Sequence, residues 1–121
     1  MTPREQAHLQ VLKILTERPG ISQRELADVL SVSLGKSNYL IKELLEKGLI
    51  KAENFRRSDR KMGYLYALTP EGIETRLHLA RAYLARKETE YEALREELAA
   101  LRRELGVPNP PPATTNPTEP P

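Results

Sequence analysis

The stretch from Ile21 to Ile50, ISQRELADVLSVSLGKSNYLIKELLEKGLI, decides how the chain folds. Ser22 followed three residues later by Glu25 is the pattern of a capping box, so we expect a helix to begin directly after Ser22. Ser33 can cap a second helix, because its hydroxyl can accept a hydrogen bond from a free backbone N–H of the first turn. Gly48 is suited to end that helix. Two short amphipathic helices joined by a tight turn predict a helix-turn-helix, whose second helix enters a DNA major groove.

A β-hairpin is predicted directly after this motif. Leu49–Phe55 and Met62–Leu68 each have the composition of a strand, and the polar segment Arg56–Lys61 forms the turn between them. Such a hairpin makes the motif a winged helix-turn-helix. Gly20 and Ile21 can add a short third strand to this sheet.

Two further helices flank the motif. Thr2-Pro3-Arg4-Glu5 is another capping box and begins a first helix that we expect to end near Glu17. Thr69-Pro70 begins a last helix, which continues without a breaking residue to Leu105. The fold class is therefore mainly α with a small β-hairpin (α+β). We expect a winged helix-turn-helix over residues 1–72, a long dimerisation helix over 73–105 and a disordered Pro-rich tail over 106–121.

The last helix carries an apolar row with a seven-residue period, which predicts a coiled coil. One row consists of Leu77, Leu84, Tyr91, Leu98 and Leu105. A second row beside it consists of Ala80, Leu94 and Leu101, and Lys87 interrupts this second row. Glu90 and Glu97 take the g positions, and Arg95 and Arg102 take the e positions. A parallel pair of helices sets each g beside an e of the second copy, whereas an antiparallel pair sets Glu against Glu. These charges favour a parallel homodimer; the alternative, a helix folded back on its own domain, leaves most of the row uncovered.

The spacing of the second helix of the helix-turn-helix divides it into two faces. Leu40 and Leu44, with Ser37 and Ile41, are expected to face inward. The outward residues lie near the start of the helix, where base edges are contacted. Asparagine can bond to adenine and lysine to guanine or phosphate. The candidate DNA-binding residues here are Ser33, Leu34, Gly35, Lys36, Asn38, Tyr39 and Lys42. Leu34 either covers the core or contacts a thymine methyl group, and the alternative for the whole set is a solvated helix face.

The predicted hairpin tip holds the densest positive charge of the chain. Four cationic residues lie within six positions, and a single aspartate offsets them. A tip of this kind is expected beside the phosphate backbone or in the minor groove, where arginine is favoured. The alternative is a charged turn that blunts a hairpin edge. The candidate wing residues are Arg56, Arg57, Ser58, Asp59, Arg60 and Lys61.

Composition excludes several classes of site. The 121 residues carry a net charge of +2 and no cysteine, which excludes disulfides and thiolate metal sites. Two isolated histidines, His8 and His78, and the lack of a Gly-rich phosphate loop leave no catalytic set, so we predict no enzyme activity, no cofactor and no metal. The sequence shows no signal peptide and no run of the ~20 apolar residues that a membrane span requires. We expect a cytoplasmic protein.

The segments LSVSLGKSNYLIKELLEKGLI, SDRK and YALTPEG resemble the winged-helix core of MarR-type transcriptional regulators. The short length, with GYLYALTPEGIETR and YLARKETEYEALREEL, is similar to the small exopolysaccharide-associated (EPS-associated) branch of these regulators. The resemblance covers roughly Arg4 to Leu105. It implies control of exopolysaccharide genes, a minor-groove contact for Arg60 and a role for Asp59 in holding the wing. Larger members usually bind small anionic or phenolic ligands between the DNA-binding lobe and a dimer domain built from both termini. Whether this shorter chain has such a pocket stays open.

The expected function is that of a sequence-specific regulator of transcription. It would bind double-stranded DNA as a homodimer on a palindromic operator, with the recognition helix in the major groove and the basic wing at the minor groove or backbone. The alternative is a winged-helix and coiled-coil adaptor that binds proteins without specific DNA binding. The basic wing favours the first hypothesis, since an adaptor has no need of it.

Overall fold

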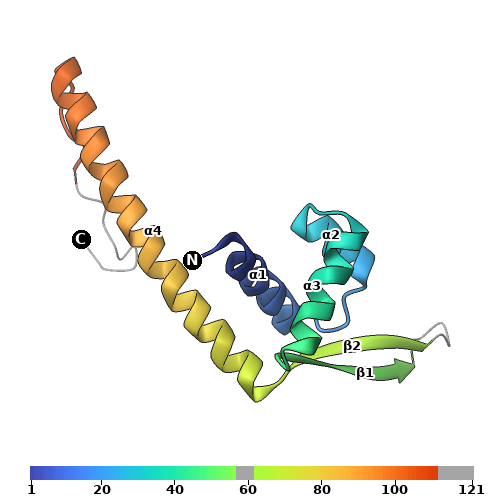
Figure 1. Ribbon diagram of the computed structural model, residues 1–121. Coiled ribbons are helices and arrows are strands. Elements are labelled where there is room, and N and C mark those ends of the chain that lie inside the picture. Colours follow the sequence, from blue (N-terminus) through green and yellow to red (C-terminus); the bar gives the residue numbers. More distant parts are fainter. Residues whose placement is uncertain (57–61, 112–121) are drawn as a thin grey trace, which may run out of the picture. The chain divides into compact units, whose positions relative to one another are not determined.

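The computed structural model describes residues 1–56 and 62–111. Within them the elements follow in the order α1 (Pro3–Glu17), α2 (Gln23–Leu30), α3 (Leu34–Glu46), β1 (Ile50–Arg56), β2 (Met62–Leu68) and α4 (Pro70–Leu105) (Figure 1). The fold class predicted from the sequence is confirmed. The chain divides into two units, Met1–Arg86 and the part from Lys87 onward. The continuous helix predicted up to Leu105 is also confirmed.

Three helices begin at the caps that the sequence predicts. The hydroxyls of Thr2, Ser22 and Ser33 each accept a hydrogen bond from the backbone N–H three residues later, at 3.1 Å in every case. Around Thr2 the capping box is complete, because the Glu5 carboxylate accepts the Thr2 backbone N–H. At the second cap, the Glu25 carboxylate accepts the Ser22 hydroxyl instead. These bonds satisfy N–H groups that a helix start would otherwise leave free.

Helix α3 ends at Glu46, and the cap that follows it at Gly48 determines where the hairpin begins. Gly48 has a positive φ of 71°, and its N–H donates to the Leu45 carbonyl while the Leu49 N–H donates to that of Leu44. This is the Schellman arrangement of a helix C-terminus. Because Leu49 is used to close the helix, β1 starts at Ile50, one residue later than expected. Strands β1 and β2 are antiparallel, with Ile50 opposite Leu68 and Arg56 opposite Met62.

The sheet of the described residues has two strands, so the expected third strand at Gly20–Ile21 is wrong. The preceding segment does approach the hairpin, through one bond from the Tyr66 N–H to the Pro19 carbonyl at 3.4 Å. Proline has no N–H to return, and the Ile21 N–H donates to Arg18. A ladder therefore cannot continue at this edge.

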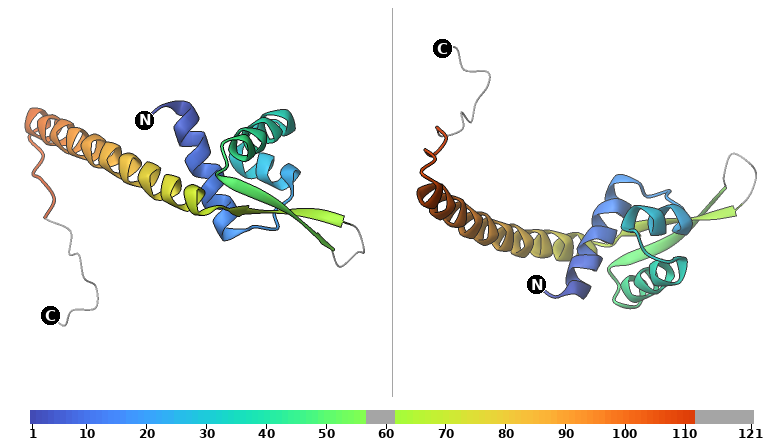
Figure 2. Two further views of the ribbon diagram at one scale, coloured as in Figure 1. Left: turned by 60° about the horizontal axis from the view of Figure 1, so that its bottom comes forward. Right: turned by 90° about the horizontal axis from the view of Figure 1, so that it is seen from above.

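The core of the first unit lies between the three short helices and the hairpin (Figure 2). Leu12 and Leu44 are 0% exposed, and Ile50 and Tyr66 carry the core onto the sheet. The Tyr66 hydroxyl accepts a hydrogen bond from the Gln23 side chain at 3.1 Å, so its polar end is satisfied. The other core members are Val11, Leu15, Ile21, Leu26, Leu40 and Ile41. The orientation of α3 thus depends on its packing against both α1 and α2.

The end of α3 and the start of α4 meet at one junction. The Thr69 hydroxyl donates to the Gly48 carbonyl at 2.6 Å and accepts the Gly72 N–H at 3.0 Å, which makes Thr69 the N-cap of α4. Its own N–H donates to the Leu49 carbonyl. A Cβ on Gly72 would collide with that same Leu49 carbonyl oxygen. The first turn of α4 can therefore lie here only because residue 72 has no side chain.

Candidate nucleic-acid interface

The outward face of α3 is formed by exposed residues at the predicted positions. Leu34 is 44% exposed and Tyr39 is 47% exposed, while Ser37 on the inward face is 0% exposed. The Ser37 hydroxyl donates to the Gln23 carbonyl of α2 at 3.3 Å, so this buried polar group fixes α3 against α2. The other outward residues that the structure leaves exposed are Ser33, Gly35, Lys36, Asn38 and Lys42. Their role in DNA binding stays a prediction.

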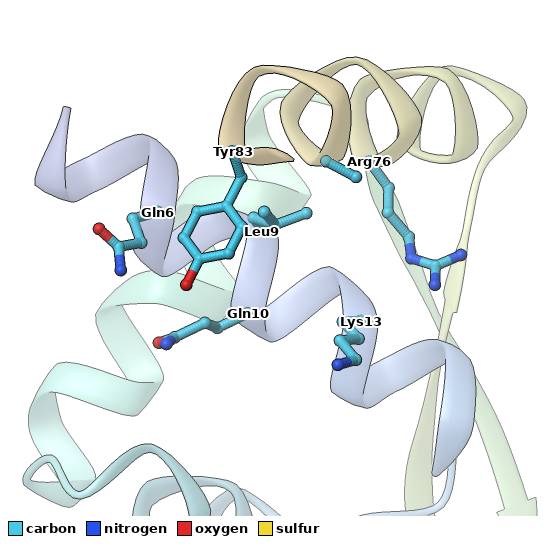
Figure 3. A pocket seen from close by; sticks show the side chains of 7 residues that line it. Gln6, Leu9, Gln10, Lys13, Arg76 and Tyr83 are labelled. Carbon is cyan, nitrogen blue, oxygen red and sulfur yellow. The ribbon is translucent and has the colours of Figure 1, made fainter. Parts of the chain in front are cut away.

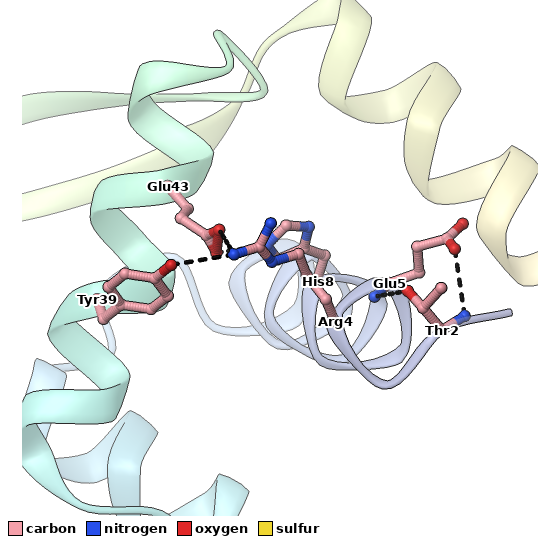
Figure 4. A network of polar contacts seen from close by, with 6 residues as sticks. All are labelled: Thr2, Arg4, Glu5, His8, Tyr39 and Glu43. Carbon is pink, nitrogen blue, oxygen red and sulfur yellow. Dashed lines mark hydrogen bonds and ion pairs between the residues drawn. The ribbon is translucent and has the colours of Figure 1, made fainter.

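Two cations, Lys36 and Arg4, lie beside the exposed phenol of Tyr39, and Figure 4 shows the contact with Arg4. The Lys36 ammonium lies 5.2 Å from the ring centroid, which is within the range of a cation–π contact. The Arg4 guanidinium, from the first turn of α1, donates from Nη2 to the Tyr39 hydroxyl at 3.1 Å. Helix α1 therefore contributes to the surface formed by the outward face of α3, a contribution that was not predicted from the sequence.

Glu43 connects this surface to the interior. Its carboxylate contacts the Arg4 guanidinium and the His8 ring nitrogen Nε2, each at 3.2 Å. Burial by itself would raise the pKa of Glu43, but the hydrogen bond to His8 and the charge of Arg4 outweigh it and hold this pKa below its ordinary value. His8 is only 4% exposed. The sequence did contain a signal for its burial, since His8 shares the helical face of Val11, Leu12 and Leu15.

The wing is described only at its base. Arg56 is the last residue of β1 and pairs with Met62 of β2. The remaining wing candidates, Arg57, Ser58, Asp59, Arg60 and Lys61, lie outside the described residues. Their contribution to a DNA interface is therefore still a prediction from charge and position.

The apolar row of α4 is exposed in the single chain. The buried residues of helix α4 are Gly72 and Leu79, and neither belongs to the apolar row. Ile73, which was not among the predicted members of the row, is 50% exposed and precedes Ala80 by seven residues. The row extends along both units, with exposed fractions between 40% and 74% for Leu77, Leu84, Tyr91, Leu94, Leu98, Leu101 and Leu105.

A groove of about 370 Å³ lies between α1 and the part of α4 in the first unit (Figure 3). The Tyr83 ring extends toward α1 between Gln6 and Leu9, and the cationic side chains of Lys13 and Arg76 lie toward the other end. Gln10 and Ala80 complete its lining. In the described part of the chain, no helix is long and apolar enough to cross a membrane, and no group of three potential metal ligands is brought together.

Comparison with known proteins agrees with this geometry. Residues 4–51 match the family model of winged helix-turn-helix DNA-binding domains. The structure is similar to AbsC, a MarR family transcriptional regulator from Streptomyces coelicolor, with 25% identity, a TM-score of 0.60 and coverage of 83% of this chain and 69% of that one. No curated protein matches the chain.

Two Staphylococcus aureus structures share the same fold. MepR in complex with DNA is 19% identical with a TM-score of 0.58, and the match covers 87% of this chain and 78% of MepR. MarR in complex with salicylate and kanamycin is 15% identical with a TM-score of 0.57, covering 80% and 68% of the two chains. The fold is that of MarR regulators: a winged helix with a long C-terminal helix.

Proposed function

We propose that this chain, whose residues 4–51 match the family model of winged helix-turn-helix DNA-binding domains, is a sequence-specific transcriptional regulator. It binds double-stranded DNA as a homodimer on a palindromic operator. Helix α3 lies in the major groove, and the basic wing from Arg56 to Lys61 lies at the minor groove or the backbone. The observation that carries the proposal is the exposed outward face of α3, with Tyr39 between the cations of Lys36 and Arg4.

The chemistry of this face suits base and phosphate contacts. The major groove is about 12 Å wide and admits a helix, whose first turns then face the base edges. Asn38 can donate to and accept from adenine, and Lys36 and Lys42 can reach guanine or phosphate. Gly35 has nothing but the Ser33 hydroxyl within 4.0 Å of an added Cβ, so the backbone there can approach a duplex closely.

The exposed row of α4 supports the homodimer. Two parallel copies can bury their rows against each other, which removes large apolar side chains from water. The same orientation brings Glu90 beside Arg95 of the second copy and Glu97 beside Arg102 of the second copy. A parallel pair is related by a two-fold axis, and a two-fold protein matches a palindromic site.

The comparisons support the class of function. MepR is a relative in fold that was crystallised with DNA, and AbsC is a transcriptional regulator of the MarR family. By analogy, we propose that this chain also binds DNA and also regulates transcription. The resemblance to the EPS-associated branch further suggests exopolysaccharide genes as the targets, and a regulator that binds DNA is expected in the cytoplasm.

Fluorescence anisotropy tests the proposal. The full chain is titrated into labelled DNA from upstream of its own gene and into a scrambled duplex, at one stated salt concentration. We expect a preference of ~1000-fold or more for the specific duplex. Asn38→Ala should reduce that preference, while Glu46→Ala, at the opposite end of α3, should leave it unchanged. Absence of binding to either duplex, even at low salt, would instead favour a protein-binding adaptor.

A further inference from the structure

Arg4 lies in the first turn of α1, outside the helix-turn-helix, yet its guanidinium joins the outward face of α3. We propose that Arg4 contacts a DNA phosphate at the rim of the major groove and also positions Tyr39. This inference rests on the proposed function, because it requires α3 to lie in that groove. It adds a part of the chain that neither the recognition helix nor the wing includes.

The geometry leaves donors of Arg4 available. Its Nη2 atom donates to the Tyr39 hydroxyl at 3.1 Å and contacts the Glu43 carboxylate at 3.2 Å (Figure 4). A guanidinium carries five N–H groups, and among the described residues both partners of Arg4 are reached through Nη2. Three N–H groups, on Nε and Nη1, remain for a further acceptor. The side chain is 60% exposed, so such an acceptor can come from solvent or from a ligand.

The position of Arg4 favours a phosphate over a base. A helix with its side chains is about 10–12 Å across, close to the ~12 Å width of the major groove. Groups beside the recognition helix, rather than at its tip, therefore meet the phosphates that line the groove. Arginine forms charge-assisted hydrogen bonds with phosphate oxygens, and two anchored bonds hold this guanidinium in place before DNA arrives.

Glu43 explains why a cation is needed at this position. A carboxylate on the recognition helix repels phosphate, and Glu43 is held ionised by its contacts with His8 and Arg4. Arg4 reduces the negative potential of Glu43 at the protein surface, while His8 contacts it from the interior. Loss of Arg4 removes one positive charge and also leaves the Glu43 charge less compensated. Both effects weaken the attraction for phosphate.

The salt dependence of binding by the full chain tests the phosphate contact. The slope of log K against log salt falls by about 0.9 for each phosphate contact that is lost, hence by close to two for a homodimer that lacks both copies. We expect this fall for Arg4→Ala. Lys13→Ala is the matched control, because it removes one charge from the same helix nine residues later, on the opposite face. Arg4→Lys, which keeps the charge, should keep most of the slope while binding more weakly.

The outcomes separate the two proposals. If the slope is the same for wild type, Arg4→Ala and Lys13→Ala while wild type keeps its sequence preference, the phosphate contact is wrong and the proposed function stands. If wild type shows no preference for any duplex, the proposed function fails first. Thermal unfolding of Arg4→Ala verifies that the chain is folded, and Arg4→Lys retains the comparison if it is not.

A double-mutant cycle tests the positioning role. Tyr39→Phe removes the hydroxyl that Arg4 contacts and keeps the ring. We expect Arg4→Ala and Tyr39→Phe to be non-additive in DNA affinity, since each breaks the same bond. Strictly additive losses would overturn the positioning role of Arg4. If the salt slope falls for Arg4→Ala and is unchanged for Tyr39→Phe, the phosphate contact is made by Arg4 and does not require the Tyr39 hydroxyl.

Discussion

At the scale of the residue, two glycines of the first unit, Gly72 and Gly35, differ in how much space surrounds them. Gly72 lies against the Leu49 carbonyl, whereas Gly35 is on the open outward face of α3. Gly72→Ala forces α4 away from Leu49 and should lower the free energy of unfolding by several kcal/mol, the range of severe packing defects. Gly35→Ala adds a better helix former and should raise the same quantity by up to ~1 kcal/mol. Urea unfolding of both variants measures the contrast.

The DNA affinity of the Gly35→Ala variant gives a second measurement beside its stability. Gly35→Ala should bind DNA more weakly although it is at least as stable, because the added methyl group faces the duplex. A Gly35→Ala protein with unchanged affinity would show that the α3 backbone does not approach DNA at this residue. Equal stability of Gly72→Ala and wild type would contradict the close contact at the junction.

The lowered pKa of Glu43 predicts acid sensitivity. A carboxyl whose pKa is lower in the folded than in the unfolded chain adds stability above its unfolded value of 4.5, and this stability is lost as the pH falls through the folded value. We therefore expect the free energy of unfolding to decline below about pH 4.5, and Glu43→Gln to decline less steeply. Glu5, whose pKa is lowered by its bonds with Thr2, contributes in the same direction and remains in the variant.

Glu46→Gln is the matched control for this pH series. It lies on the same helix, is exposed and should follow the wild-type curve. Chemical unfolding at a series of pH values between 3 and 7 gives the comparison. Identical pH profiles for Glu43→Gln and wild type would mean that the His8 and Arg4 contacts do not stabilise the ionised form.

At the scale of the element, the sequence predicted the helix boundaries because they depend on neighbouring residues. The hydroxyls of Thr2, Ser22 and Ser33 reach backbone N–H groups only three positions away, so no knowledge of the tertiary fold is required. The start of β1 was missed by one residue because the closing bond of α3 occupies Leu49. The third strand failed for a related reason, since the one available bond ends on Pro19.

The contacts between elements could not be read in this way. Arg4 and Tyr39 are 35 residues apart, as are His8 and Glu43, and nothing in the local pattern pairs them. They meet because α1 packs against α3 in the core. The outward face of α3 was predicted because helical spacing alone separates it from the buried face. Its proposed contacts with DNA, like those of the wing, remain predictions.

The exposed row of α4 predicts a dimer that side-chain truncation disrupts. Leu94→Ala with Leu98→Ala keeps helix propensity but removes apolar contacts, and each Leu→Ala change in a packed interior costs ~2–5 kcal/mol. We expect the dimer dissociation constant of the full-length double variant to be at least ~100-fold higher than that of wild type. Sedimentation equilibrium measures the association, and circular dichroism verifies the helix content.

A matched pair of substitutions on the opposite face of the same helix serves as the control. Glu96 and Arg103 lie at f positions, away from the row, so Glu96→Ala with Arg103→Ala should leave the association unchanged. If the full-length wild type sediments as a monomer at micromolar concentration, the exposed row has another partner. If both double variants weaken association equally, the row is not the interface.

At the scale of the whole molecule, the flanking charges of α4 predict the orientation of the two copies in the proposed dimer. Glu90→Arg with Glu97→Arg sets Arg against Arg in a parallel dimer and should weaken it several-fold, because each exposed pair contributes less than ~1 kcal/mol. Adding Arg95→Glu and Arg102→Glu to the same chain restores opposite charges and should restore association. Sedimentation equilibrium at low salt compares the three proteins.

An antiparallel dimer predicts a different pattern. It already sets Glu against Glu in wild type, so the two Arg substitutions would not weaken it and the four-residue exchange would not act as a rescue. Operator symmetry tests the homodimer but not its orientation. Parallel and antiparallel pairs are both two-fold symmetric, so an asymmetric footprint on the bound duplex would contradict a homodimer of either kind.

The junction at Thr69 has a consequence for the evolution of this fold. The Thr69 hydroxyl bonds to Gly48 at the end of α3 and to Gly72 at the start of α4. Leu49 contacts both helix ends, because its N–H donates to Leu44 and its carbonyl lies against Gly72. A descendant can exchange the residues on the outward face of α3, which are proposed to read DNA, without disturbing this point. It cannot change residue 72 alone, because any side chain there meets the Leu49 carbonyl. Binding preference is therefore free to diverge among descendants, while these few positions can be replaced only together.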